Sequence, residues 1–260
     1  MIGVVDQTTA DKAVRVALRG DFLIDVAKGL ISGHSLVGKF GYNAAVGTTT
    51  ETVWAQQGRL TYVAANTTMT ISSEDADDTI LGNGARTVKV TYQDVNNVEK
   101  SVTVDMNGQT GVTVATDMYR VYRAQVILAG ATGTNEGDIR IGTGTITSGV
   151  PAVVHTAVIA TEGQTNQAFY TIPAGKTGYM LSYYTSVGKS NNDGLVDLFA
   201  CPLGQAWVMK EHITLLSTPF THEFKAPRTY TAGTDLEARA TSTAGTVDVP
   251  FGFDILLVDD

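Results

Sequence analysis

The fold of this chain is decided by the stretch Asn166-Gln-Ala-Phe-Tyr-Thr-Ile-Pro-Ala-Gly-Lys-Thr-Gly-Tyr-Met-Leu-Ser-Tyr-Tyr-Thr-Ser-Val-Gly188. Residues 169–172 are strand formers, Pro173 begins a turn, and residues 179–187 form a second, longer run of strand formers. Inside the turn, Gly175-Lys176-Thr177 resembles the end of a phosphate-binding loop. The nature of this turn therefore separates a nucleotide-dependent enzyme from a structural protein.

The residues around the turn favour the structural interpretation. A phosphate-binding loop needs a glycine five positions before its Gly-Lys-Thr end, and Tyr170 stands there. The loop must also be followed by a helix, whose N-terminus faces the phosphates. Here it is followed by Tyr-Met-Leu-Ser-Tyr-Tyr, which predicts a strand. We therefore predict that residues 172–177 form a hairpin corner between two strands of a sandwich.

The composition indicates a mainly β protein. The 260 residues are 43% hydrophobic and only 17% charged, with 37 Thr and 27 Gly. Thr fits a pleated surface and Gly supplies turns, whereas segments rich in Ala, Glu, Lys and Leu are nearly absent. The chain is long enough for two ordinary domains or for one large all-β domain.

The charge and the cysteine content exclude several classes of function. A net charge of −8 and a pI near 4.9 argue against a nucleic-acid partner, which needs a basic surface. The single Cys201 excludes an internal disulfide framework and a cysteine-based zinc site, which fits a reducing cytoplasm. We see no signal peptide or transmembrane segment, so we expect no membrane partner.

Residues 1–47 differ from the rest of the chain and predict an N-terminal arm. Apolar residues from Phe22 to Ile31 recur with helical spacing, Asp21 suits an N-cap and Gly33 suits a stop, so we place a helix near 22–32. The glycine-punctuated residues 33–47 are interpreted as an extended connection. Such a helix is marginal alone and must pack on its own domain or on a neighbouring subunit.

The rest of the chain predicts two β-sandwich domains. Strand signals at intervals of 8–12 residues fill 48–150, which we assign to a first sandwich. Pro151 follows a run of Gly and Thr, and we place the boundary there. Residues 151–260 contain eight strand signals, the number of a jelly roll. The predicted strands are 52–56, 60–63, 69–72, 85–92, 99–106, 112–115, 119–128, 138–141, 153–160, 167–172, 177–187, 195–200, 205–216, 221–225, 235–241 and 249–258.

Several side-chain patterns resemble parts of metal-binding or catalytic sites. The acidic run Glu74-Asp-Ala-Asp-Asp78 lacks the spacing and the glycine of a calcium loop, so a solvated loop is favoured. The four histidines show no helical zinc spacing, although His212 and His222 could approach each other across paired strands. No Gly-x-Ser-x-Gly elbow marks a hydrolase. We predict no catalytic, cofactor-binding or metal-binding residues and no enzymatic activity. The four histidines mentioned above are His34, His155, His212 and His222.

Aromatic residues leave a glycan-binding alternative open. β-Sandwiches host sugar sites on exposed rings, although aromatics on strands more often form core or interface. The rings considered are Trp54, Trp207, Tyr170, Tyr179, Tyr183 and Tyr184.

Several phrases, in this order, resemble virion structural proteins of tailed bacteriophages, especially marine and cyanobacterial ones. They are Leu36-Val-Gly-Lys-Phe-Gly-Tyr-Asn43, Thr50-Glu-Thr-Val-Trp54, Asp77-Asp-Thr-Ile-Leu-Gly-Asn-Gly-Ala-Arg-Thr-Val88, Thr171-Ile-Pro-Ala-Gly-Lys-Thr177, His222-Glu-Phe-Lys225 and Phe253-Asp-Ile-Leu-Leu-Val-Asp259. The resemblance covers roughly residues 20–260. It implies a protein of the capsid or tail, without enzymatic activity.

These observations together predict a capsid cement or decoration protein that stabilises adjacent capsomers. The expected partners are a major capsid protein and sister subunits, with a homotrimer favoured because it suits quasi-threefold positions. The expected location is the virion, assembled in the host cytoplasm. The alternative is a head-fibre or tail component that binds a host receptor or glycan.

Overall fold

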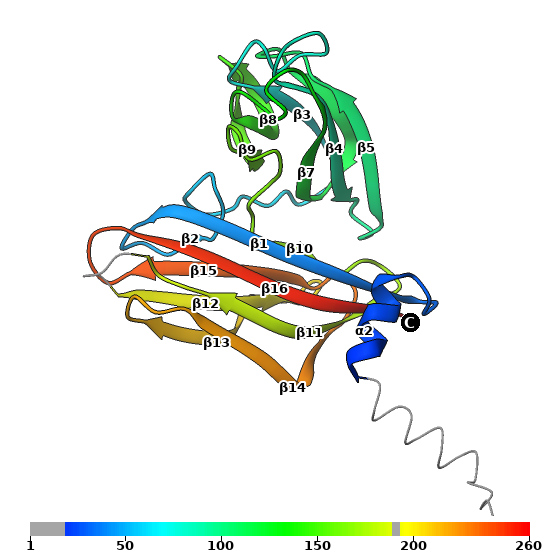
Figure 1. The fold of residues 1–260 in the computed structure, drawn as a ribbon, viewed down its shortest axis with the longest axis vertical. Helices are drawn as coiled ribbons and strands as arrows, with labels where there is room; N and C mark the ends of the chain where they lie inside the picture. Colours follow the sequence, from blue (N-terminus) through cyan, green and yellow to red (C-terminus); the bar gives the residue numbers. More distant parts are fainter. Residues whose placement is uncertain (1–18, 189–192) are drawn as a thin grey trace, which may run out of the picture.

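The structure, a computed structural model, describes residues 19–188 and 193–260 of the chain. It confirms the predicted fold class, since antiparallel β-sheets dominate and one short helix precedes them. Two bodies lie one above the other in Figure 1, and each encloses its own hydrophobic core.

The larger body is a jelly roll. In chain order its eight main strands form one sheet of order 1-8-3-6 (β1-β16-β11-β14) and a second of order 2-7-4-5 (β10-β15-β12-β13). This order is that of two Greek keys folded into a double sheet. A two-residue strand, β2 (Glu51–Thr52), pairs with β15. The strands are β1 (His34–Val46), β10 (Phe169–Thr171), β11 (Lys176–Thr185), β12 (Gly194–Cys201), β13 (Val208–Leu215), β14 (Phe220–Tyr230), β15 (Asp235–Ser242) and β16 (Val247–Asp259).

The smaller body, which we call the inserted domain, interrupts the jelly roll between its first and second main strands. Its sheets have the orders β6-β3-β8-β9 and β5-β4-β7, and they enclose a core that includes Ile71, Val90 and Ile141. Its strands are β3 (Thr67–Ser73), β4 (Ala85–Gln93), β5 (Glu99–Asp105), β6 (Val112–Met118), β7 (Arg120–Ala129), β8 (Ile139–Thr147) and β9 (Val150–Val158).

Each predicted strand after residue 68 overlaps a strand of the structure. The two predictions nearest the domain junction differ. Residues 60–63 form no strand, and the strand expected at 52–56 is reduced to β2. Both segments belong to the connection that leads from the jelly roll into the inserted domain.

The predicted domain boundaries need correction. β1 is a full strand of the jelly roll, paired with β16 from His34–Val258 to Val46–Val247, so residues 34–46 are not a connecting arm. The boundary expected at Pro151 falls within β9, which pairs with β8 and stays in the inserted domain. The local sequence could not reveal this arrangement, because the first strand finds its partner at the opposite end of the chain. The part of the predicted arm at residues 1–18 lies outside the described residues.

The predicted helix is present but shifted. The structure has α2 at Arg19–Ala27, so Asp21, the expected N-cap, lies inside the helix. The helix closes at Gly29, which has a φ of 72°. The Gly29 amide donates to the Val26 carbonyl and the Leu30 amide to the Asp25 carbonyl, which is the bonding of a Schellman motif. The stop signal is therefore Gly29 rather than Gly33. No helix among the described residues is long and apolar enough to cross a membrane.

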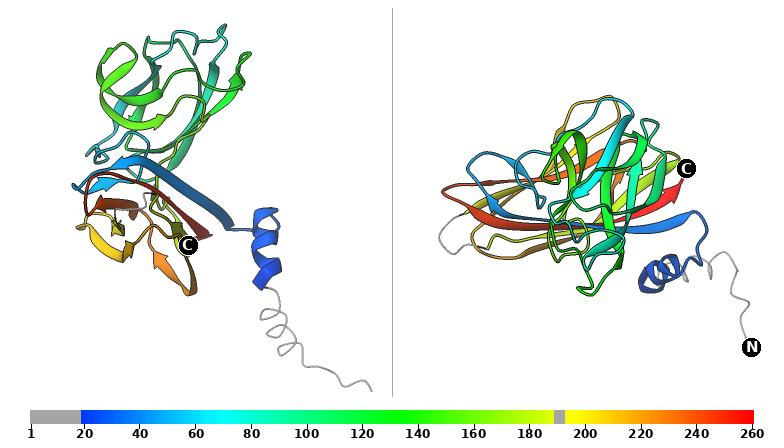
Figure 2. Two further views of the ribbon diagram at one scale, coloured as in Figure 1. Left: turned by 60° about the vertical axis from the view of Figure 1, so that its left-hand side comes forward. Right: turned by 90° about the horizontal axis from the view of Figure 1, so that it is seen from above.

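α2 lies outside both sandwiches. In Figure 2 it stands beside the jelly roll, next to the end where β1 begins. The ring of Phe22 in α2 contacts His34 at the start of β1 edge to face, with ring centroids 5.7 Å apart. This contact fixes the helix close to the edge of the β1-β16-β11-β14 sheet.

Candidate functional site

The turn at Gly175-Lys176-Thr177 is a corner between the two sheets of the jelly roll. β10 pairs with β15, whereas β11 pairs with β14 and β16, so the predicted hairpin is corrected to a crossing from one sheet to the other. Lys176 forms an ion pair with Asp259, and Thr177 Oγ1 donates to Asp260 Oδ1 at 2.6 Å. The two side chains that a phosphate loop would use are thus engaged, and a strand follows them.

The acidic run around Asp78 holds loops together. Asp78 is fully buried and its carboxylate accepts hydrogen bonds from Ser73 Oγ at 2.5 Å and from the amide of Ala85 at 2.6 Å. The amides of Glu136 and Gly137 also donate to it, both at 2.9 Å. No group of three or more metal-ligating side chains occurs within residues 19–188 and 193–260. Asp78 therefore acts as an internal capping group at the far end of the inserted domain.

The histidines do not come together in the described part of the chain. His212 lies on β13 and His222 on β14, which belong to different sheets, so the approach across paired strands does not occur. His212 instead contacts Asp197, with Nδ1 2.5 Å from Oδ1. His155 Nδ1 lies 2.9 Å from the Thr61 carbonyl oxygen, and burial lowers the pKa of this imidazole.

Neither tryptophan offers an exposed platform for a sugar. Trp54 is buried, and its indole N–H donates to the Gly58 carbonyl at 3.1 Å. Trp207 is partly buried and packs against Tyr62, while the Arg239 guanidinium lies over its ring. The remaining tyrosines range from buried to half-exposed. They are Tyr170, Tyr179, Tyr183 and Tyr184.

An apolar groove lies beside α2, and we call it the α2 groove. It has a volume of about 580 Å³ and lies between the helix and the outward face of the β1-β16-β11-β14 sheet. Its apolar lining consists of Phe22, Leu23, Leu36, Val37, Leu181, Phe224, Pro227 and Leu256.

The helix also carries apolar side chains out into solvent. Ile24 is 52% exposed, and Leu30, just after the helix, is 68% exposed. Single exposed apolar residues are common, but apolar residues gathered around an open groove mark a surface for protein contact. The α2 groove is therefore the candidate assembly surface, and Ile24 and Leu30, which are not part of its lining, are further exposed apolar side chains of the same segment.

A second region of interest is the junction between the two bodies, where charged side chains are buried. Arg120 of β7 reaches Asp235 of β15, with Nη2 2.9 Å and Nε 3.1 Å from Asp235 Oδ2. Thr171 Oγ1 donates to Asp235 Oδ1 at 2.5 Å, and Gln93 Nε2 donates to the Thr171 carbonyl at 2.9 Å. These bonds fix the inserted domain on the jelly roll.

The buried charges at the junction belong to no motif that the sequence shows. In the sequence, such a charge is marked only by its position. It stands where the alternation of a strand predicts an apolar residue on the buried face. Lys39 shares a strand face with Val37 and Gly41, and Glu237 and Arg239 lie on a strand of entirely buried or half-buried residues. This signal is weak, because charges at the same spacing usually lie on a solvated face.

Comparisons with known proteins assign no family to this chain. No protein-family profile matches the chain, and no curated protein matches its sequence. A chain in the structure of infectious bursal disease virus Gx strain aligns over 87% of this chain and 71% of its own length, with 8% identity and a TM-score of 0.23. A chain of the T13 particle of the same virus aligns over 87% and 70%, with 9% identity and a TM-score of 0.24. Similarity at these TM-scores is too weak to assign a fold. The jelly roll is assigned from the strand order of this chain alone.

Proposed function

We propose that this chain is a non-enzymatic structural protein of a virion, and specifically a cement or decoration protein on a phage capsid. In this role the jelly roll packs against the shell and against sister subunits, and the inserted domain stands above it. The expected partners are the major capsid protein and two further copies of the chain in a trimer, assembled in the host cytoplasm.

The observation that carries the proposal is the candidate assembly surface at α2. A helix of nine residues is too short to be stable by itself, and this one lines an open apolar groove with Phe22 and Leu23. Ile24 in the helix and Leu30 just after it are also exposed. Burial of apolar area drives association between subunits. A neighbouring copy, or the shell, is the partner that this surface fits.

The strand order and the sequence resemblance give further support. Jelly rolls of this order build viral capsids, although lectins and cupins share the architecture. The resemblance to phage virion proteins selects the first of these. The burial of Trp54 and the engaged Gly175-Lys176-Thr177 turn support neither a lectin nor a nucleotide enzyme.

The first experiment tests the assembly surface. We expect Ile24→Glu and Leu30→Glu to convert an oligomer into a monomer in sedimentation velocity and to abolish binding to purified shells. Leu203→Glu is the matched control, because Leu203 is equally exposed (60%) but lies in the turn between β12 and β13. Equal oligomer size and shell binding in all three variants and the parent would remove α2 from the proposal.

The second experiment tests the location. Mass spectrometry and immunogold labelling of purified particles, from the virus that encodes the chain, should find it on intact virions. Its absence from particles, together with its presence in the lysate of infected cells, would contradict a structural role.

A second candidate function is supported by the far end of the inserted domain. Leu81 is 89% exposed there, and Ile80 and Leu128 beside it are about half exposed. Gly130, which follows β7, donates from its amide to the Gly84 carbonyl at 2.8 Å, which brings both loops to one tip. A head-fibre or tail component would use this apolar tip to contact a host receptor protein. Loss of host adsorption in Leu81→Ser particles with unchanged shell occupancy would favour this candidate.

A further inference from the structure

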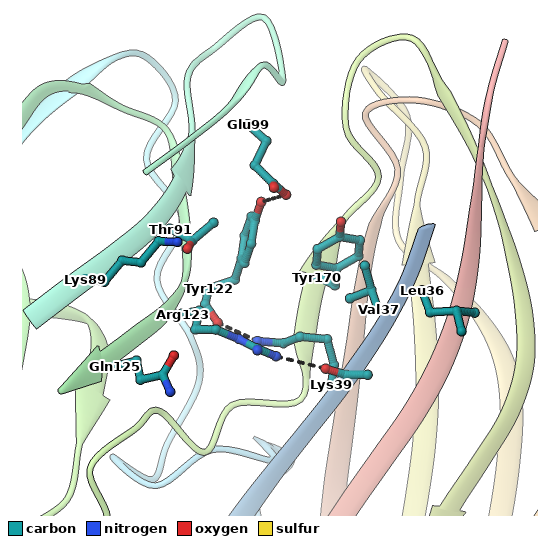
Figure 3. A pocket seen from close by; sticks show the side chains of 11 residues that line it. Leu36, Val37, Lys39, Lys89, Thr91, Glu99, Tyr122, Arg123, Gln125 and Tyr170 are labelled. Carbon is teal, nitrogen blue, oxygen red and sulfur yellow. Dashed lines mark hydrogen bonds between the residues drawn. The ribbon is translucent and has the colours of Figure 1, made fainter. Parts of the chain in front are cut away.

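A cavity at the domain junction has a lining unlike the rest of the molecule. It has a volume of about 280 Å³ and lies between β1 of the jelly roll and strands β4, β5 and β7 of the inserted domain. Figure 3 shows side chains from both bodies converging on it. Its charged and phenolic residues are Lys39, Lys89, Arg123, Glu99, Tyr122 and Tyr170.

Lys39 is the central residue of this lining. It is paired with Phe253 in the register of β1 and β16, so the alternation of the strand turns it toward the inside of the jelly roll. Because β1 is the edge of its sheet, the side chain reaches the inserted domain, where its amine donates to the Tyr122 carbonyl. Lys39 is only 4% exposed, and none of the ion pairs among the described residues includes it. A buried ammonium group without a counter-ion is rare in proteins.

The other charges of the cavity do not compensate Lys39. Arg123 lies beside it in Figure 3 and donates to the Gly38 carbonyl at 2.9 Å. Glu99 is the one acidic residue of the lining, and it already accepts a hydrogen bond of 2.5 Å from the Tyr122 hydroxyl. Burial, and then repulsion by Arg123, hold the pKa of Lys39 well below its usual range. The lining thus has two cationic groups, Arg123 and Lys89, a buried lysine amine whose charged form is disfavoured, and one occupied carboxylate.

Tyr170 adds an unused hydrogen-bond donor. It is 2% exposed, and its ring packs edge to face on that of Tyr122 with centroids 5.0 Å apart. Its hydroxyl lies near Glu99 but forms no hydrogen bond of normal geometry with any described residue. Burial and the Glu99 charge raise the pKa of Tyr170, so the hydroxyl keeps its proton and remains a donor. Buried hydroxyls are normally satisfied, which points to a missing acceptor.

We propose that this cavity binds a small oxyanion of the phosphate class between the two domains. Lys39 and Arg123 supply the charge, Tyr170 donates a hydrogen bond, and Lys89 stands at the exposed side. The cavity is at the small end of ligand pockets, which are typically about 300–1,000 Å³, so it suits a single phosphate group rather than a large ligand. Charge-assisted hydrogen bonds to phosphate are among the strong ones in proteins.

The bound anion would join the two bodies. Lys39 belongs to the jelly roll and Arg123 to the inserted domain, and an anion between them replaces their repulsion by two attractions. A ligand that binds only the folded protein raises its stability by mass action. Phosphate therefore acts as an electrostatic clamp at the junction, independent of the assembly surface at α2.

The test is a titration of the full chain with inorganic phosphate by isothermal calorimetry, at constant ionic strength balanced with chloride. We expect saturable binding at one site and a rise in melting temperature. Lys39→Met and Arg123→Gln should each weaken binding about tenfold or more, since each removes a charged contact. Tyr170→Phe should weaken binding less, without loss of stability in the absence of phosphate, because the hydroxyl it removes has no partner.

Matched controls separate a built site from general charge effects. Lys225→Met removes an exposed lysine on β14, and Tyr230→Phe removes another buried hydroxyl without a partner, outside the cavity. Both should bind phosphate like the parent. Methyl phosphate as a second probe distinguishes a free ion from a phosphate monoester on a larger molecule, and binding of either supports the proposal. No saturable binding of either probe, or equal binding by the parent, Lys39→Met and Arg123→Gln, overturns it.

Discussion

Arg120 and Asp235 form a buried ion pair between the inserted domain and the jelly roll, with Nη2 of Arg120 2.9 Å from Oδ2 of Asp235. The guanidinium also lies over the Tyr119 ring, 3.8 Å from its centroid. Two domains that were joined only by a flexible connection would not need such a contact. The pair shows that the inserted domain is held in a fixed position.

The first prediction is that Arg120→Met strongly destabilises the chain. The substitution leaves the Asp235 carboxylate buried without its cation, and the loss of one partner of a buried pair typically costs about 3–5 kcal/mol. Urea unfolding should show the loss. Lys176→Met is the control, because Lys176 pairs with Asp259 at an exposed position, where a loss of at most about 1 kcal/mol is expected. Equal losses in the two variants would contradict a buried latch.

The second prediction concerns Gly41, at the edge strand β1. A Cβ atom at this position would lie 2.2 Å from the Val53 carbonyl oxygen and 2.3 Å from the Ala168 amide nitrogen. Both are backbone atoms, so Gly41→Ala should destabilise by about 1–3 kcal/mol through overpacking. In Gly38→Ala the new Cβ meets only the Asp254 side chain, at 3.3 Å, and stability should be nearly unchanged. Thermal melting of the two variants provides the comparison.

The same glycine explains why the sequence predicts a connecting arm where the structure has the strand β1. Residues 33–47 contain several glycines, which in a sequence indicate turns and loops. In the structure Gly41 is required by the close approach of two other backbone segments rather than by a turn. The need for a glycine came from residues distant in the sequence, so no local pattern could distinguish the two causes.

The strands and the fold class could be predicted because they depend on local patterns. Thr87-Val-Lys-Val-Thr-Tyr92 alternates as a strand with one buried face must, and β4 occupies it. The insertion between β1 and β10 could not be predicted, because the pairing of His34 with Val258 leaves no local trace. The buried positions of Lys39 and Arg120 depend on how the two bodies meet, which is likewise non-local.

The third prediction concerns Asp78 at the far end of the inserted domain. Asp78→Asn replaces one accepting carboxylate oxygen by an amide NH2 group, which is itself a donor and faces backbone donors, so the loops that Asp78 joins should be destabilised. A hydrogen bond to a charged group contributes about 1.5–3 kcal/mol to stability, and we expect the free energy of unfolding to fall by an amount of this size. Asp77→Asn, at the exposed neighbouring residue, is the control and should leave stability unchanged. Hydrogen exchange of the Ala85 and Gly137 amides would locate the effect.

The fourth prediction concerns the pH dependence of stability that Lys39 causes. The pKa of Lys39 is lowered in the folded protein and returns to about 10.5 on unfolding. Between these two values the unfolded chain binds more protons than the folded one, so stability rises with pH in this window. Below the lowered pKa the amine is charged in both states, and its burial penalty is fully present.

Lys39→Met should remove this rise, so that the stability difference between Lys39→Met and the parent shrinks as pH increases toward 10. The buried tyrosines do not disturb the comparison: their raised pKa values act above pH 10 and cancel between the two proteins. Urea unfolding midpoints in a buffer without phosphate, from neutral pH upward, measure the difference. A difference that stays constant over this range would mean that Lys39 keeps its proton in the fold, and that its charge is already compensated at the junction.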